Sequence, residues 1–125
     1  MLDALAEVTG RIIGCAIEIH RALGPGLLES AYEQCLCREM SLAGIRFERQ
    51  VPLPVVYKGV KVDCGYQIDI LVEDSVVLEL KAVEKLLPIH EAQLITYLRL
   101  SGKRIGLLIN FNVPVLAEGT RRMVL

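Results

Sequence analysis

The stretch "QIDILVEDSVVLELK", residues 67–81, decides how this chain folds, because it places charged side chains inside two apolar strands. Side chains alternate between the two faces of a strand with a period of two. Leu78 and Leu80 therefore share one face, while Glu79 and Lys81 lie on the other. Charges without partners are costly to bury. An acid and a base at these positions therefore indicate a functional face, although a solvated face with a weak ion pair would give the same pattern.

The loop between the two strands determines which side chains meet. If residues 73–75 form the loop, Val72 pairs with Val76, and Asp69 then lies directly opposite Glu79. Directly opposed side chains have Cβ atoms about 4.5–5.5 Å apart. Two carboxylates at that separation repel each other unless a cation or a raised pKa offsets the repulsion.

A divalent metal ion with oxygen ligands would offset this repulsion. Lys81 lies next to the two acids and would hold an attacking water or a phosphate oxygen. Two carboxylates, a metal ion and a lysine form the arrangement used in metal-assisted phosphodiester hydrolysis. The hairpin therefore predicts a site for this chemistry at Asp69, Glu79 and Lys81.

The rest of the chain alternates between helical and strand patterns. The expected elements are helices over residues 3–23 and about 27–43, strands over 45–59, 60–72 and 75–83, a helix over 88–100, a strand over 103–112 and a short strand over 121–125. Pro52 and Pro54 predict an irregular or edge strand. This order predicts an α/β fold with two N-terminal helices, an antiparallel β-meander, a crossover helix and a further, parallel strand.

The composition favours one domain spanning residues 1–125. Hydrophobic residues make up 53% of the chain and the mean hydropathy is +0.44. No apolar run approaches the roughly 18 residues of a membrane span, and the first residues lack the order of a signal peptide. We therefore expect a cytoplasmic protein with no membrane partner, and surplus apolar surface that favours a homo-oligomer.

The net charge of −1 argues against strong non-specific binding of duplex DNA, which favours basic proteins. The four cysteines do not form a zinc-binding pattern, because Cys35 and Cys37 are separated by one residue and no second pair complements them. We expect all four to be reduced and structural, without zinc.

Four segments together resemble a known family. The segment "GYQIDILVEDSVVLELK" resembles the core signature of the PD-(D/E)XK nuclease-like superfamily, in which an acid and a hairpin precede acid-x-Lys. The segment "LGPGLLESAYE" carries Gly26, Glu29 and Tyr32 in the spacing that names the GxxExxY family. The segments "AVEKLLPIHEAQLITYLRLSG" and "GLLINFNVP" are also similar to that family. The resemblance covers about residue 5 to the C-terminus and implies a restriction-endonuclease-like core.

The resemblance also implies a function, that of a metal-dependent nuclease that acts on DNA or RNA with Mg²⁺ or Mn²⁺. It implies that the carboxylates of Asp69 and Glu79 bind the metal ion together with the main-chain carbonyl of Leu80. Glu29 would add a further acidic ligand, directly or through water. Lys81 would orient the water or stabilise developing charge, and Gln93 matches a Gln-containing helix motif of related nucleases. Gln67 stands where family members often carry a basic residue.

Two other functions are compatible with the same residues. One is a catalytically inactive nuclease-fold module that binds nucleic acid or a protein partner. The other is a small oligomeric enzyme that uses the metal on a nucleotide. Glu29 also has a structural explanation, because an acid in the first turn of a helix interacts favourably with the helix dipole.

Overall fold

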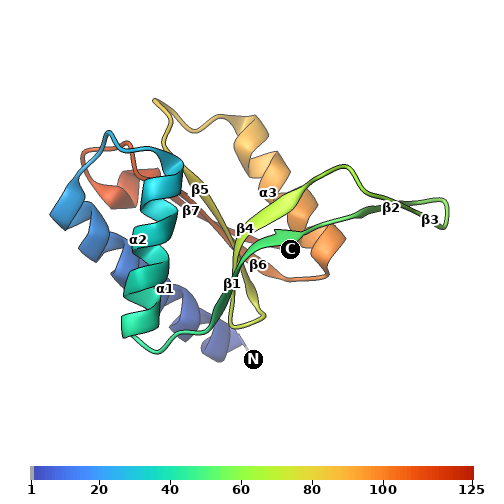
Figure 1. Ribbon diagram of the computed structural model, residues 1–125, viewed down its shortest axis with the longest axis horizontal. Helices are drawn as coiled ribbons and strands as arrows, with labels where there is room; N and C mark the ends of the chain where they lie inside the picture. The colour runs from blue at the N-terminus through green and yellow to red at the C-terminus, as the bar shows by residue number, and fades with distance from the viewer. Residues whose placement is uncertain (1) are drawn as a thin grey trace.

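The centre of the molecule is a mixed five-stranded sheet, shown in Figure 1 in a computed structural model that describes residues 2–125. In spatial order its strands are β1 (Phe47–Pro52), β4 (Gln67–Val72), β5 (Val76–Lys81), β6 (Ile105–Asn110) and β7 (Thr120–Val124). Neighbouring strands are antiparallel except β5 and β6, which are parallel and connected through α3 (Pro88–Ser101). This order confirms the predicted α/β fold class with its meander and crossover helix. Met1 of the expected domain lies outside the described residues.

Helices cover both faces of the sheet (Figure 1). The helices α1 (Leu2–Leu23) and α2 (Glu29–Leu42) pack on one face, and their core includes Ile70, Leu78 and Leu80. On the other face, α3 packs on a second core that includes Leu71, Val77, Leu94 and Leu108. Strands β4 and β5 thus contribute apolar side chains to a core on each face of the sheet, as expected for strands covered on both sides.

Close packing of α3 on β6 depends on Gly106. A Cβ atom at this position would come within 2.8 Å of Cδ1 of Leu94, which is closer than van der Waals contact permits. A side chain here would therefore force the Leu94 side chain to shift. A short 3₁₀ helix, η1 (Leu116–Gly119), leads into β7 and completes the chain order.

The hairpin between β4 and β5 has the predicted register. Val72 pairs with Val76, Leu71 with Val77 and Ile70 with Leu78, so residues 73–75 form a three-residue loop. The amide of Ser75 donates a hydrogen bond to the carbonyl of Val72 at 2.9 Å and closes the turn. The apolar pattern selected this register, because a shift by one residue would turn every side chain to the wrong face.

The expectation of one continuous strand over residues 60–72 is wrong. The chain forms β3 (Val60–Val62), leaves the strand conformation, and resumes at β4. The carboxylate of Asp63 accepts a hydrogen bond from the amide of Gly65 at 3.1 Å, and Gly65 has a left-handed φ of 76°. This local turn ends the strand, because a side-chain acceptor satisfies an amide that a ladder would otherwise use.

The strand expected over residues 45–59 is interrupted at its prolines, as predicted. It divides into β1 and β2 (Val55–Tyr57), and β2 pairs only with β3 in a separate two-stranded sheet. This sheet projects from the body of the molecule as an arm (Figure 1). Among residues 2–125, no helix has both the length and the apolar composition needed to cross a bilayer.

Candidate active site

The carboxylates of Asp69 and Glu79 each accept a backbone hydrogen bond across the gap between β4 and β5. Oε2 of Glu79 accepts a hydrogen bond from the amide of Asp69 at 2.9 Å, and Oδ2 of Asp69 accepts one from the amide of Leu80 at 2.8 Å. The regular β4–β5 ladder ends at Ile70 and Leu78. The two acids therefore lie side by side, as predicted, but their carboxylates take the place of main-chain carbonyls and no regular cross-strand pair forms there.

The backbone changes its pattern of alternation at Asp69. On the other side of β4, Arg49 pairs with Ile70 and Val51 with Ile68, so this ladder also passes over Asp69. Ile70 packs in the core under α1 and α2, whereas Ile68 packs in the core under α3. Strict alternation predicts that Ile68 and Ile70 share one face. That prediction is wrong, because the ladder is interrupted on both sides of Asp69, the residue between them.

The pKa values of both acids are raised above their ordinary values. Burial, and next the charge of Asp69, raise the pKa of Glu79 to about 8, while the amide of Asp69 and the charge of Lys81 lower it. Burial is also the largest cause that raises the pKa of Asp69, and the amide of Leu80 is the largest that lowers it. Buried, adjacent carboxylates cannot both ionise without a counter-charge. Their oxygens form a donor set suited to a hard divalent cation, which would take the place of a proton.

A polar pocket of about 330 Å³ lies beside these acids, where α2, β1, β4 and β5 converge. It is lined by Glu29, Ser30, Glu33, Arg49, Gln50, Asp69 and Leu80. The structure thus brings three of the predicted residues, Asp69, Leu80 and Glu29, to one pocket. Gln93 lines a different and mainly apolar groove on α3, where its Nε2 contacts the Tyr97 hydroxyl at 3.5 Å.

Glu33 is a buried acid of this pocket that the sequence did not single out. Its Oε2 accepts hydrogen bonds from Nε of Arg49 at 3.0 Å and from Nη2 of Arg49 at 2.7 Å. Its Oε1 accepts a hydrogen bond from Nε2 of Gln50 at 2.8 Å. Glu33 follows Glu29 by one helical turn, and this i, i+4 spacing was the available signal. No strand pattern could have indicated Arg49 and Gln50.

Among the described residues, no group of three or more His, Cys, Asp or Glu side chains is arranged to hold a metal ion. The reason lies in the two acids of α2 that line the pocket, Glu29 and Glu33. Both oxygens of Glu33 are bonded to β1, and Glu29 is exposed at the start of the helix. The carboxylate oxygens that lie close enough together to bind one metal ion are therefore those of Asp69 and Glu79.

A family model described as the PD-(D/E)XK nuclease superfamily matches residues 6–123, nearly the whole chain. The chain belongs to the PD-(D/E)XK nuclease superfamily. No curated protein and no solved structure matches the sequence significantly.

In this PD-(D/E)XK nuclease superfamily member, the motif at Gly26, Glu29 and Tyr32 has a structural basis. Tyr32 is fully buried and stacks on Phe111 with ring centroids 4.4 Å apart. Its hydroxyl donates a hydrogen bond to the carbonyl of Gly24 at 2.5 Å and accepts one from the amide of Leu27 at 3.2 Å. Tyr32 therefore fixes the loop that starts α2 and, with it, the position of Glu29.

Lys81 is the last residue of β5 and is half-buried. Its carbonyl accepts a hydrogen bond from the amide of Phe111 at 3.0 Å. Asn110, which is buried, exchanges two hydrogen bonds with the backbone of Val83, at 3.0 and 2.9 Å. These contacts fix the chain on either side of Lys81, whose charge lies close enough to lower the pKa of both Asp69 and Glu79.

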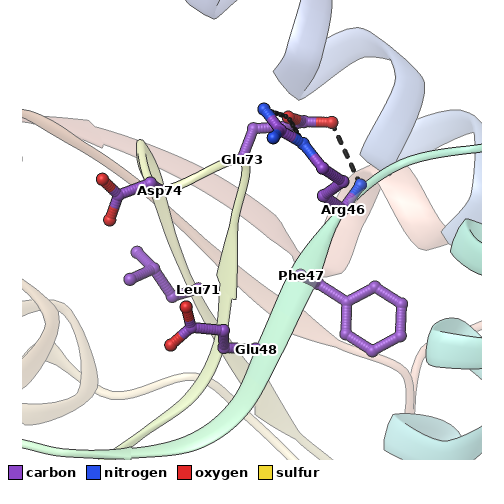
Figure 2. A pocket seen from close by; sticks show the side chains of 6 residues that line it. All are labelled: Arg46, Phe47, Glu48, Leu71, Glu73 and Asp74. Atoms are coloured by element: carbon purple, nitrogen blue, oxygen red, sulfur yellow. Dashed lines mark hydrogen bonds and ion pairs between the residues drawn. The ribbon is translucent and has the colours of Figure 1, made fainter.

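A smaller hollow of about 180 Å³ lies at the other end of the hairpin (Figure 2). There Nη2 of Arg46 forms an ion pair with Oε2 of Glu73 at 3.0 Å, and the amide of Arg46 donates to Oε1 of Glu73 at 3.0 Å. Phe47 points to the opposite side of β1 from Glu48 (Figure 2). The exposed Arg46–Glu73 pair anchors the turn, and an exposed pair of this kind contributes little stability.

Proposed function

We propose that this chain is a metal-dependent nuclease that hydrolyses phosphodiester bonds in DNA or RNA, within the GxxExxY branch of its superfamily. The observation that carries the proposal is the Asp69–Glu79 pair, because the half-buried carboxylate of Asp69 and the buried one of Glu79 are adjacent, and a counter-charge would let them ionise together. Superfamily membership supports nuclease chemistry. The pocket of Asp69 is open to one of the acids that the family pattern predicts, Glu29.

The residues of the chain divide the work. Asp69, Glu79 and the carbonyl of Leu80 would hold Mg²⁺ or Mn²⁺, with Glu29 contributing directly or through water. A bound divalent ion polarises the phosphate and lowers the pKa of water. Lys81 would hold the attacking water or a phosphate oxygen and stabilise the negative charge that develops. Gln93 would contact the substrate from α3, where its Nε2 bonds the Tyr97 hydroxyl. Burial, and next the charges of Glu79 and Asp69, raise the pKa of Tyr97, so these carboxylates lie near that side of the helix.

The test is cleavage of labelled single- and double-stranded DNA and RNA in the presence of Mg²⁺ or Mn²⁺. Lys81→Ala should lose about 10²–10³-fold in rate, as expected when one group that stabilises developing charge is removed. Lys85→Ala is the matched control, because Lys85 is an exposed lysine four residues after Lys81 and lies outside the strand. Metal-dependent cleavage that is equal in Lys81→Ala and Lys85→Ala would reject the assigned role.

One observation favours the alternative, a catalytically inactive module that binds nucleic acid or a protein partner. Glu33, the buried acid of the pocket, is fully bonded to Arg49 and Gln50. Binding of oligonucleotides without cleavage under any metal condition would support this alternative over the nuclease.

A further inference from the structure

Arg49 differs from an ordinary surface arginine in how firmly its guanidinium group is held. Two of its N–H groups bind one oxygen of the buried Glu33. A guanidinium carries five N–H groups in a rigid fork. Its remaining N–H groups have no hydrogen-bond partner in the part of the chain that the structure describes, and the residue lines the same pocket as Asp69. The Arg49 side chain is 44% exposed, so these groups are accessible.

The neighbouring backbone is distorted in a way that completes this arrangement. Gln50 has a φ of 49°, which is unusual for a residue with a side chain, and the β1–β4 ladder passes over it. Backbone strain of this kind persists only where surrounding contacts hold it. Here the side-chain Nε2 of Gln50 donates a hydrogen bond to Oε1, the second oxygen of Glu33, at 2.8 Å. Both oxygens of Glu33 are thus engaged by β1, and Glu33 acts as a fixed support for Arg49.

We infer that Arg49 binds the phosphate backbone of the nucleic acid at this pocket, with Glu33 as its positioning residue. The pocket is otherwise acidic, since Glu29, Glu33 and Asp69 line it, and a phosphate entering it needs a cation. Arginine suits this role because its planar fork matches two phosphate oxygens, and a partly used guanidinium remains positively charged. The inference deepens the proposed function and rests on it for the identity of the ligand.

The experiment measures binding, separately from cleavage, by anisotropy of labelled single- and double-stranded oligonucleotides at several salt concentrations. Ca²⁺ replaces Mg²⁺, because its larger and more flexible coordination supplies the counter-charge without the octahedral geometry of Mg²⁺. The variants are Arg49→Ala and Arg49→Lys. Arg46→Ala is the matched control, because it removes the same charge from an Arg–Glu pair at the far end of the hairpin (Figure 2).

Arg49→Ala should weaken binding about tenfold or more, as expected for loss of a charge-assisted hydrogen bond. The slope of log affinity against log salt should become shallower by about 0.7–0.9, the value of one phosphate contact. Arg46→Ala should change neither quantity. Arg49→Lys should keep the salt slope but lose part of the affinity, because lysine lacks the two-pronged geometry.

Equal affinity and salt slope in wild type, Arg49→Ala and Arg46→Ala would overturn the inference, as would an absence of binding by the wild type. If Arg49→Ala fails to fold, unchanged affinity in Arg49→Lys overturns it instead. Loss of binding in Arg49→Ala, without metal-dependent cleavage by the wild type, would keep this inference and reject the nuclease. Metal-dependent cleavage by the wild type, together with unaltered binding in Arg49→Ala, would keep the nuclease and reject the role of Arg49.

Discussion

Glu79 accepts a hydrogen bond from the backbone amide of Asp69 at 2.9 Å, so a side-chain carboxylate stands in the ladder where a main-chain carbonyl normally would. Asp69 does the same for Leu80 at 2.8 Å. The two strands remain connected at this point, yet each acid is fixed by the backbone that carries or adjoins the other. The site is therefore built into the pairing of the sheet, and its charge state should be coupled to the stability of the fold.

Divalent ions should stabilise the wild-type protein. An ion that binds only the folded state at 100 times its Kd adds about 2.7 kcal/mol to the free energy of unfolding. Asp69→Asn should lose most of this gain, and without metal it should be as stable as the wild type or more so, because repulsion with Glu79 is removed. The measurement is the melting temperature with and without Mg²⁺ or Mn²⁺. Asp74→Asn is the control, since Asp74 is an exposed loop acid paired with Lys103, and an equal metal shift in Asp69→Asn would place the ion elsewhere.

Without metal, the free energy of unfolding should fall as the pH rises from about 5 to about 8. The pKa of Glu79 is raised from 4.5 to about 8 in the folded protein, so the folded state binds more protons than the unfolded state over this range. Stability falls with pH wherever the folded state binds more protons. Urea unfolding in the presence of a chelator should show this slope, and Glu79→Gln should flatten it.

Glu73→Gln is the control for this pH dependence. Hydrogen bonds from Arg46 lower the pKa of Glu73, so its contribution is present above its ordinary pKa and is lost only as the pH falls below that range. Glu73→Gln should therefore leave the slope between about pH 5 and 8 unchanged. A wild-type stability that rises across this range would contradict the assigned charge state of Glu79.

Tyr32→Phe should lower the free energy of unfolding by about 1–3 kcal/mol, because the buried hydroxyl bonds both Gly24 and Leu27. The stacking on Phe111 remains possible in this variant, so the change isolates the two hydrogen bonds. Tyr57→Phe, at an exposed tyrosine of the arm, should stay within about 0.5 kcal/mol of the wild type. Equal stabilities of the two variants in urea would show that the hydroxyl does not hold the loop.

We expect the protein to associate with itself through the arm formed by β2 and β3. Val56, Tyr57 and Val60 are 64%, 63% and 61% exposed there, and an isolated two-stranded sheet is at best marginally stable in water. Light scattering at micromolar concentration should give at least twice the single-chain mass of 13.9 kDa. Val60→Lys should reduce the mass, whereas Leu42→Lys, at an exposed leucine of α2, should not. A wild-type mass of one chain would contradict this expectation.

The sequence by itself determined the order of the helices and of the main-sheet strands, the register of the central hairpin and the juxtaposition of Asp69 and Glu79. These features follow from local periodicity, because a three-residue loop is the one that keeps Val72, Val76 and Leu78 in phase with the core. The strand break at Pro52 and Pro54 was also predictable from local sequence, because proline has no backbone N–H to donate to a strand ladder.

Only the tertiary structure decided how the acids bond and what surrounds them. The carboxylates of Asp69 and Glu79 accept main-chain hydrogen bonds across strands. Whether such bonds form depends on the separation of the two backbones, which the residue types do not give. Arg49 and Gln50 bind Glu33 although they lie sixteen and seventeen positions further along the chain, and the left-handed φ of Gln50 leaves no periodic signal in the sequence. Periodicity records which face a side chain takes, whereas contacts between separate elements arise only when the chain packs.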